Sequence, residues 1–214
     1  TFHTQFDAHA ELGILQKYLK RYFDDLDGRI AVSNLCVESM DRYCKGKYRI
    51  IPNGVDIDKF NPACEKIHKF NDGKLNIFFL SRLEPRNGLE YLIEAFAKIH
   101  AKRKDCRLII GGGGPLMGHY RSLVPTETQP DVHFVGEILG SRPNFYATAD
   151  IFCFPTTRAS FGITLLEAMA AGKPVVAFTL PAFRQVIKEA DEGVLCGAPD
   201  ANNLADALMG LLDD

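Results

Sequence analysis

Apolar runs alternate with amphipathic segments along the chain from residue 75 onward. Short apolar runs with the length of buried strands begin near residues 75, 106, 131, 150, 174 and 193. Apolar residues recur at helical spacing over residues 88–103, 115–124, 141–149, 161–171, 183–189 and 201–212. This alternation predicts an α/β fold with a doubly wound, parallel, six-stranded Rossmann-like sheet. Ligands of such a sheet gather at the carboxyl ends of its strands.

The first 74 residues follow a different pattern. Apolar side chains recur at helical spacing from residue 8 to residue 26 and face lysine and arginine, which predicts an amphipathic helix. A strand at 29–33, a helix over about 34–44 and a strand at 48–51 follow. Residues 56–74 are polar and are typical of a connection between domains. We therefore expect a first unit over 1–50, a connection over 51–74 and the sheet domain over 75–214.

Composition narrows the class of protein. The chain is 46% hydrophobic and 24% charged, which is ordinary for a soluble globular protein. Its net charge of -2 offers no basic surface for nucleic acid. Without a signal peptide, a membrane-spanning run or paired C-x-x-C cysteines, we expect a cytoplasmic protein with buried free thiols. The basic face of the helix at 8–26 keeps peripheral contact with the inner face of the membrane open as an alternative.

The segment from Asp150 to Phe178 contains the most informative motif. A helix is expected to begin near Gly162, directly after a strand and its loop, and a helix start suits an anion such as a diphosphate. Glu167 lies in the second turn of this helix, within reach of sugar hydroxyl groups. An isolated glutamate at such a position is more often a solvated surface residue.

The residues around Glu167 are not an isolated match. The run Ser-Phe-Gly-Ile-Thr-Leu-Leu-Glu-Ala-Met-Ala-Ala-Gly, residues 160–172, resembles the signature of the retaining GT-B glycosyltransferases of family 4, also called glycosyl transferase group 1. In that family one glutamate contacts the donor sugar and a second holds the nucleotide ribose. Glu167 occupies the second place, and Ala159 stands where the first would fall. The resemblance implies nucleotide-sugar contacts for the helix start, comprising Ser160, Phe161, Gly162, Ile163 and Thr164.

Other strand ends carry the same resemblance. Arg82 follows the first strand, where a guanidinium can grip a diphosphate or form an interdomain salt bridge. Its surroundings are similar to the family's Arg-x4-Lys-Gly clamp, with Asn87 in the place of the lysine. The glycines at 111–114 let backbone approach a ligand closely and resemble the family's Gly-x-Gly-Pro loop. The resemblance thus implies nucleotide contacts for Arg82, Asn87, Gly112, Gly113, Gly136 and Ile138.

The chain begins Thr-Phe-His-Thr, which is similar to a loop in phosphatidylinositol mannosyltransferase-like members of the family. There the histidine faces the donor sugar, so the resemblance implies a catalytic role for His3 beside Arg82. A GT-B enzyme has two Rossmann-like domains and binds its acceptor mainly through the first. We expect the C-terminal, donor-binding half plus a remnant of the N-terminal domain, in a GT-B enzyme that transfers a hexose to a lipid or saccharide acceptor. The donor is expected to be GDP- or UDP-linked, with no metal or other cofactor.

Two other interpretations stay open. Ala159, Asn87 and the missing acceptor domain favour a nucleotide-sugar-binding module without transfer activity. A GT-B relative such as an epimerase or a phosphorylase would need further acid/base residues or a cofactor-binding lysine, and neither is identifiable. We expect the chain to be inactive alone. Its residues 1–50 are expected to be poorly ordered or to form a homodimer through their apolar faces.

Overall fold

Six parallel strands form the main sheet of the computed structural model, which describes residues 1–3, 20–188 and 193–213. In chain order they are β3 (Leu75–Leu80), β4 (Cys106–Gly111), β5 (Val132–Gly136), β6 (Ile151–Phe154), β7 (Val175–Phe178) and β8 (Val194–Cys196). Their order across the sheet is β5-β4-β3-β6-β7-β8. Each strand begins within one residue of its predicted start. The expected doubly wound α/β fold is confirmed.

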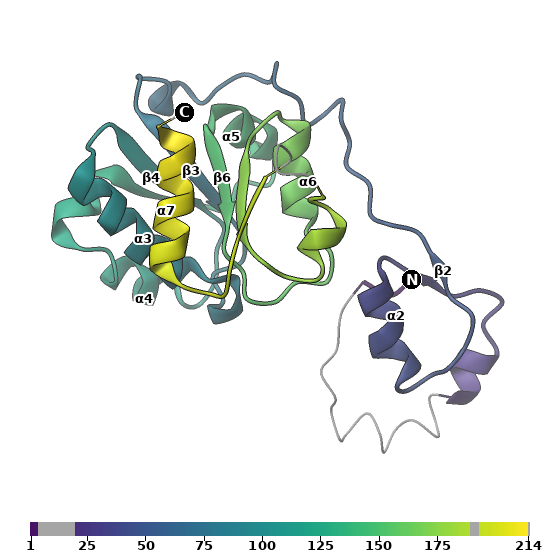
Figure 1. Ribbon diagram of the computed structural model, residues 1–214. Coiled ribbons are helices and arrows are strands. Elements are labelled where there is room, and N and C mark those ends of the chain that lie inside the picture. The colour runs from purple at the N-terminus through teal and green to yellow at the C-terminus, as the bar shows by residue number, and fades with distance from the viewer. Residues whose placement is uncertain (4–19, 189–192, 214) are drawn as a thin grey trace.

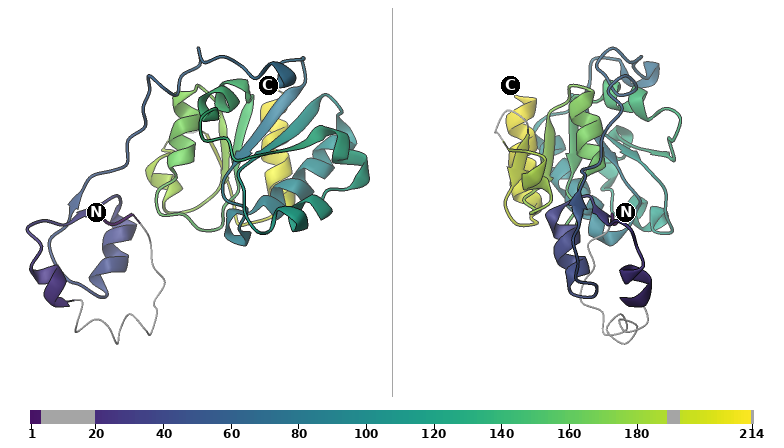
Figure 2. Two further views of the ribbon diagram at one scale, coloured as in Figure 1. Left: turned by 180° about the vertical axis from the view of Figure 1, so that it is seen from behind. Right: turned by 90° about the vertical axis from the view of Figure 1, so that its right-hand side faces the viewer.

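Helices cover both faces of this sheet (Figures 1 and 2). On one face α3 (Leu89–Lys102) packs against α7 (Ala201–Leu212), and on the other α5 (Arg142–Thr148) packs against α6 (Ile163–Ala170). Because both faces are covered, Ile77, Phe78 and Phe79 of β3 are all fully buried, which is why the strands appear in the sequence as continuous apolar runs.

The order of the strands creates a crevice between β3 and β6. The chain moves outward from β3 through β4 to β5, then crosses back to place β6 on the other side of β3. The connections that follow β3 and β6 therefore lead away from each other at the carboxyl ends of these two strands. In open sheets of this type such a switch point is where ligands bind. These strand ends form the lower edge of the sheet in Figure 1.

Some predicted helices differ from the observed ones. The helix expected at 115–124 is shorter, as α4 (Met117–Ser122), and 3-10 helices occur at Pro85–Asn87 and Thr126–Asp131. The helix expected at 183–189 is wrong within the described residues, because only the 3-10 helix Phe183–Gln185 forms there. Its apolar side chains, Phe183 and Ile187, lie one turn apart, and a single turn is enough to bury both.

A smaller parallel sheet lies within residues 1–50, joined to the main sheet by the long connection seen in Figure 1. It contains β1 (Ile30–Ala31) and β2 (Arg49–Ile50), and Phe2 pairs with Ala31 on the far side of β1. The helix α2 (Asn34–Asp41) follows β1 and is capped by Ser33. Most of the helix predicted at 8–26 lies outside the described residues. Within the part that is described, residues 20–24 are helical.

Two further expectations concern the cysteines and the membrane. All six cysteines are free thiols, and five of them are buried, as their apolar surroundings in the sequence predicted. Within the described ranges, no helix has both the length and the apolar character needed to span a bilayer.

Candidate functional site

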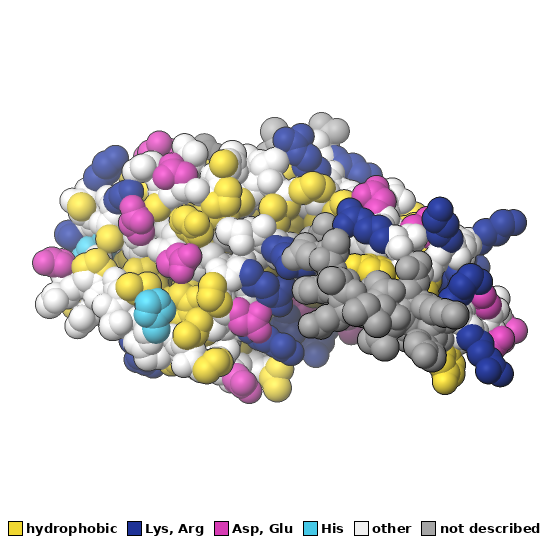
Figure 3. All heavy atoms as spheres, turned by 90° about the horizontal axis from the view of Figure 1, so that it is seen from below, with side chains coloured by type: hydrophobic (Ala, Val, Ile, Leu, Met, Phe, Trp, Pro, Cys, Tyr) yellow, Lys and Arg dark blue, Asp and Glu magenta, His cyan; other side chains and the backbone are white. Residues whose placement is uncertain are grey.

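A pocket of about 340 Å³ opens at the carboxyl edge of the main sheet, beside the switch point. Three strand ends and two helix starts contribute to it. Its lining comprises Leu80, Ser81, Arg82, Gly112, Gly113, Glu137, Ile138, Leu139, Arg142 and Thr164. Figure 3 looks onto this edge of the molecule and shows basic, acidic and apolar side chains intermixed across it.

Beneath the pocket lies a buried carboxylate, that of Glu167 in α6. Only 5% of this residue is exposed, so it is not the solvated surface glutamate that its position alone would suggest. One oxygen, Oε2, accepts hydrogen bonds from the Arg142 guanidinium and from the Tyr146 hydroxyl, the latter at 2.8 Å. The other oxygen, Oε1, has no hydrogen-bond partner among the described residues. This leaves Oε1 without an internal partner, although Glu167 is not among the residues that line the pocket.

Tyr146 fixes the orientation of this carboxylate. Its burial, and then the negative charge of Glu167, raise the pKa of the Tyr146 hydroxyl well above its usual range. The hydroxyl therefore keeps its proton and remains a hydrogen-bond donor to Glu167 at any physiological pH.

Two buried polar atoms beside the pocket lack partners within the described part of the chain. They are Nε of Arg142 and Oγ1 of Thr164, and both residues line the pocket. Buried polar groups are nearly always hydrogen-bonded, because leaving one unpaired is costly. Both atoms lie within the wall of the pocket rather than on its surface, so a ligand reaches them only if the Arg142 or Thr164 side chain turns.

Arg82 and Asn87 occupy different environments although they belong to one loop. The Arg82 side chain is 82% exposed, and its only ion pair among the described residues, to Glu84, spans 4.0 Å, so the guanidinium can turn toward an anion in the pocket. Asn87 is buried and does not line the pocket. Its Nδ2 donates to the Arg82 carbonyl at 2.8 Å, so Asn87 braces the loop that carries Arg82.

Gly112 is required by the shape of the pocket floor. Its φ is +112°, and a Cβ atom there would lie 1.8 Å from the Ser81 carbonyl oxygen. The backbone of β4 thus passes directly against that of β3 at the pocket. Gly136 supports the same arrangement, because its carbonyl accepts a 2.7 Å hydrogen bond from the Gly112 N–H.

The start of α6 points its first turn at the pocket through Thr164. Its N-cap, Gly162, has a φ of +100° and provides no side chain to cap the helix. The first N–H groups of α6 consequently lack a capping side chain, which favours an anion. Ile163 is 44% exposed.

His3 lies apart from the pocket lining. It follows Phe2, the residue that pairs with Ala31 in the small sheet, and its side chain is exposed. The catalytic role expected for His3 stays a prediction.

Sequence reasoning found part of the pocket and missed part. Five of the expected residues line it, namely Arg82, Gly112, Gly113, Ile138 and Thr164. Asn87, Gly136, Gly162 and Glu167 belong to the elements around it, and their ligand contacts remain predictions. Missed were Leu80, Ser81, Glu137, Leu139 and Arg142. Arg142 did leave a signal, because a cation in the first turn of a helix opposes the helix dipole unless a carboxylate holds it.

Comparisons with known proteins place the chain in a family. Residues 74–214 match the family model described as glycosyl transferases group 1. The chain is similar to a phosphatidyl-myo-inositol mannosyltransferase of Mycolicibacterium smegmatis, with 35% identity over 100% of this chain and 55% of that protein. It is also 35% identical, over 77% of its length and 46% of the relative's, to a GDP-mannose-dependent monoacylated alpha-(1-6)-phosphatidylinositol monomannoside mannosyltransferase of Corynebacterium glutamicum.

Among solved structures, Anabaena HepE in complex with UDP has a similar fold. Its TM-score is 0.81 at 20% identity, over 100% of this chain and 62% of that one. The chain spans about half the length of the curated relatives that it matches.

Proposed function

We propose that this chain, which belongs to the glycosyl transferases of group 1, carries the nucleotide-sugar donor site of a retaining glycosyltransferase. The observation that carries the proposal is the meeting, in one pocket, of an exposed arginine, a glycine loop and a helix start without a capping side chain. A guanidinium and the N–H groups of a helix start both suit a diphosphate. In this proposal residues 75–214 form the donor domain, 51–74 the connection and 1–50 part of the acceptor-side domain.

Each group has a role in the transfer that we propose. Arg82 and the start of α6 bind the diphosphate and stabilise the charge that develops on it as its bond to the sugar breaks. Glu167 accepts a hydrogen bond from a ribose hydroxyl through Oε1, the oxygen that Arg142 and Tyr146 leave open. His3 contributes from the sugar side. Ser160, Phe161 and Ile163 act through the backbone that leads into α6.

We infer that guanine is the preferred base. Glu137 lines the pocket where it reaches β5, the edge strand of the sheet. A carboxylate offers two acceptor oxygens, which match the adjacent N1–H and amino groups of guanine. Uracil has one N–H between two carbonyl groups, whose oxygens a carboxylate repels. The GDP-mannose-dependent relative supports GDP, whereas HepE was solved with UDP.

The class of acceptor is inferred from the relatives rather than from the pocket of this chain. We infer a lipid or saccharide hydroxyl, held mainly by an acceptor-side domain, with the enzyme working in the cytoplasm at the inner face of the membrane. The names of both mannosyltransferase relatives, which include phosphatidylinositol, favour the lipid.

Calorimetric titration of GDP and UDP into the chain and into a Glu167→Gln variant tests the donor site. The variant keeps the size of the side chain but loses the charge, so binding should weaken by about 1.5–3 kcal/mol, the scale of a charged hydrogen bond. Glu94→Gln is the control, since Glu94 is exposed and pairs with Lys98 on α3. GDP should bind the unchanged chain more tightly than UDP. Equal affinity of the Glu167→Gln variant and the unchanged chain would contradict the ribose assignment.

A further inference from the structure

The loop that leads into α6 is held by residues from outside the main sheet. We call residues 160–162 the entry loop. The Ser33 hydroxyl, from the small sheet, lies 3.2 Å from the Ser160 carbonyl oxygen. The Phe161 side chain packs against the buried cluster of Ala31, Val32 and Cys36. The entry loop is therefore attached to residues 1–50 at two successive positions.

Ser33 has two functions in this contact. Its oxygen accepts a 3.3 Å hydrogen bond from the Cys36 N–H and so caps α2. Its single proton has two acceptors in reach, the Ser160 carbonyl at 3.2 Å and the Cys36 sulfur at 3.4 Å. Sulfur is the weaker acceptor, so the proton belongs to Ser160. With only 2% of Ser33 exposed, water has little access to compete for this bond.

The surroundings make this contact important for the position of the loop. A pocket of about 350 Å³ separates the two parts beside it, lined from one side by Val32, Asn34 and Asn53 and from the other by Phe161 and Leu166. Close packing therefore does not fix the entry loop along the whole junction. The hydrogen bond from Ser33 and the contact of Phe161 supply attachment where the junction is open.

The entry loop leads directly into the proposed donor site. Gly162 is the N-cap of α6, and Thr164, four residues after Ser160, lines the donor pocket. A displacement of Ser160 moves the first turn of α6 with it. A site whose binding-competent arrangement is populated only part of the time binds its ligand more weakly by that fraction.

We propose that Ser33 is a positioning residue for the donor site, which holds the entry loop so that the start of α6 faces the diphosphate. This rests on the proposed function. Because coupling between two sites is reciprocal, nucleotide binding also strengthens the attachment of residues 1–50 to the main sheet. The affinity of the donor site for nucleotide therefore depends on whether residues 1–50 are attached to the main sheet.

Separation-of-function variants test this proposal. Ser33→Ala removes both the cap and the donated hydrogen bond, whereas Ser33→Asp keeps a capping oxygen but has no proton to donate. Both should weaken the affinity for GDP and UDP by about three- to tenfold, the scale of one hydrogen bond. Asp200→Ala is the control, because it removes the cap of α7 on the other face of the sheet and should lower stability without changing affinity.

Hydrogen exchange gives a second readout, which can be measured even for a variant that binds nucleotide weakly. In Ser33→Ala, amides of residues 160–164 should exchange faster than in the unchanged chain, and GDP should no longer slow exchange in α2. Wild-type affinity in both Ser33 variants, or unchanged exchange at residues 160–164, would overturn the positioning role while leaving the proposed function intact. No binding of either nucleotide to the unchanged chain would instead overturn the proposed function, and this inference with it.

Discussion

At the scale of single residues, the site depends on a charge pair that only the fold creates. Arg142 begins α5 and Glu167 lies in α6, twenty-five positions later, yet the two share a partly buried ion pair. Sequence resemblance pointed to Glu167 because its neighbours match a motif. No motif surrounds Arg142, whose one signal in the sequence is a cation at a helix start, and the packing of α5 against α6 shows which carboxylate holds it. Residues that act through distant partners are the ones that sequence reasoning misses.

A substitution at Gly112 tests how closely the strands must approach at the pocket floor. In Gly112→Ala the new Cβ atom would meet the Ser81 carbonyl at 1.8 Å, and φ would remain positive. We expect the free energy of unfolding to fall by at least about 1–3 kcal/mol, the cost of a strained backbone, and nucleotide binding to be lost. Urea denaturation followed by circular dichroism measures the first effect.

Gly118→Ala is the matched control for that experiment. Gly118 lies within α4, and nothing lies within 4 Å of a Cβ atom placed there. Alanine is the better helix former, so this variant should be as stable as the unchanged chain or more stable by up to about 1 kcal/mol. Equal stability of the Gly112 and Gly118 variants would show that the pocket floor tolerates a side chain.

At the scale of elements, strands were easier to predict than helices. Parallel strands are buried on both faces, so β3 and β4 appear as apolar runs, broken only near their starts by Asn76 and Arg107. Helices such as α4 are amphipathic, and the periodicity of their residues continues into turns that do not extend the helix. The 3-10 helix at Phe183–Gln185 shows the same effect more strongly, since one buried turn resembles the start of a long helix.

The strand β5 carries a histidine whose titration should affect stability. Burial, and then the positive charges of Lys69 and Arg107, lower the pKa of His133 below its usual value, although Asp131 acts in the opposite direction. His133 therefore stays neutral in the folded chain at pH values where the unfolded chain already binds a proton. The free energy of unfolding should fall as the pH drops from 7 to 5.

The variant His133→Phe isolates this contribution. His133 packs against Phe70 with 5.2 Å between ring centroids, so a phenylalanine can keep the contact. The stability of the variant should depend less steeply on pH between 7 and 5. Asp131, whose pKa is lowered, acts in the same direction only below about pH 5, outside this window. Parallel slopes for both proteins in chemical denaturation would contradict a role for His133.

At the scale of the whole molecule, the chain spans about half the length of its curated relatives. Retaining transfer requires an acceptor hydroxyl held against the sugar, and such positioning supplies a large part of the rate enhancement. We expect the purified 214-residue chain to bind nucleotide but not to transfer sugar to lipid or saccharide acceptors at a useful rate. Turnover by this chain at the rate of a full-length relative would contradict the division of labour proposed here.

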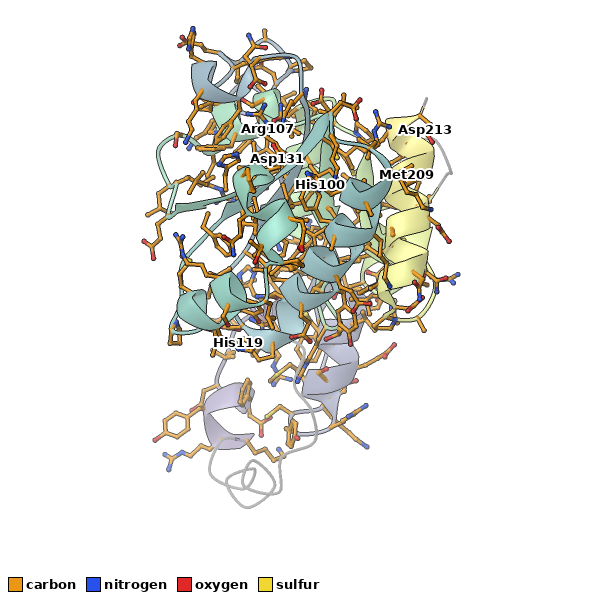
Figure 4. The ribbon with its side chains drawn as sticks, turned by 90° about the vertical axis from the view of Figure 1, so that its left-hand side faces the viewer. His100, Arg107, His119, Asp131, Met209 and Asp213 are labelled. Carbon is orange, nitrogen blue, oxygen red and sulfur yellow. The ribbon has the colours of Figure 1, made fainter. Side chains whose placement is uncertain are left out.

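The two edges of the main sheet offer an internal comparison. The carboxyl edge carries the pocket, with the exposed guanidinium of Arg82 and the start of α6 that no side chain caps. At the opposite edge His100 bonds Asp131 at 3.1 Å and the guanidinium of Arg107 pairs with Asp72, so the charges there are compensated, although Nε of Arg107 has no partner among the described residues (Figure 4). We therefore expect a diphosphate to bind at the carboxyl edge rather than at the opposite edge.

Amide chemical-shift mapping of the labelled chain during titration with GDP tests the central claim most directly. The account predicts saturable shifts at Ser81 and Arg82, at Gly112 and Gly113, at residues 137–139 and at the start of α6. Amides near His100 and Asp131 at the opposite edge should stay unchanged. Shifts centred on that opposite edge, or no saturable shifts with either GDP or UDP, would contradict the account.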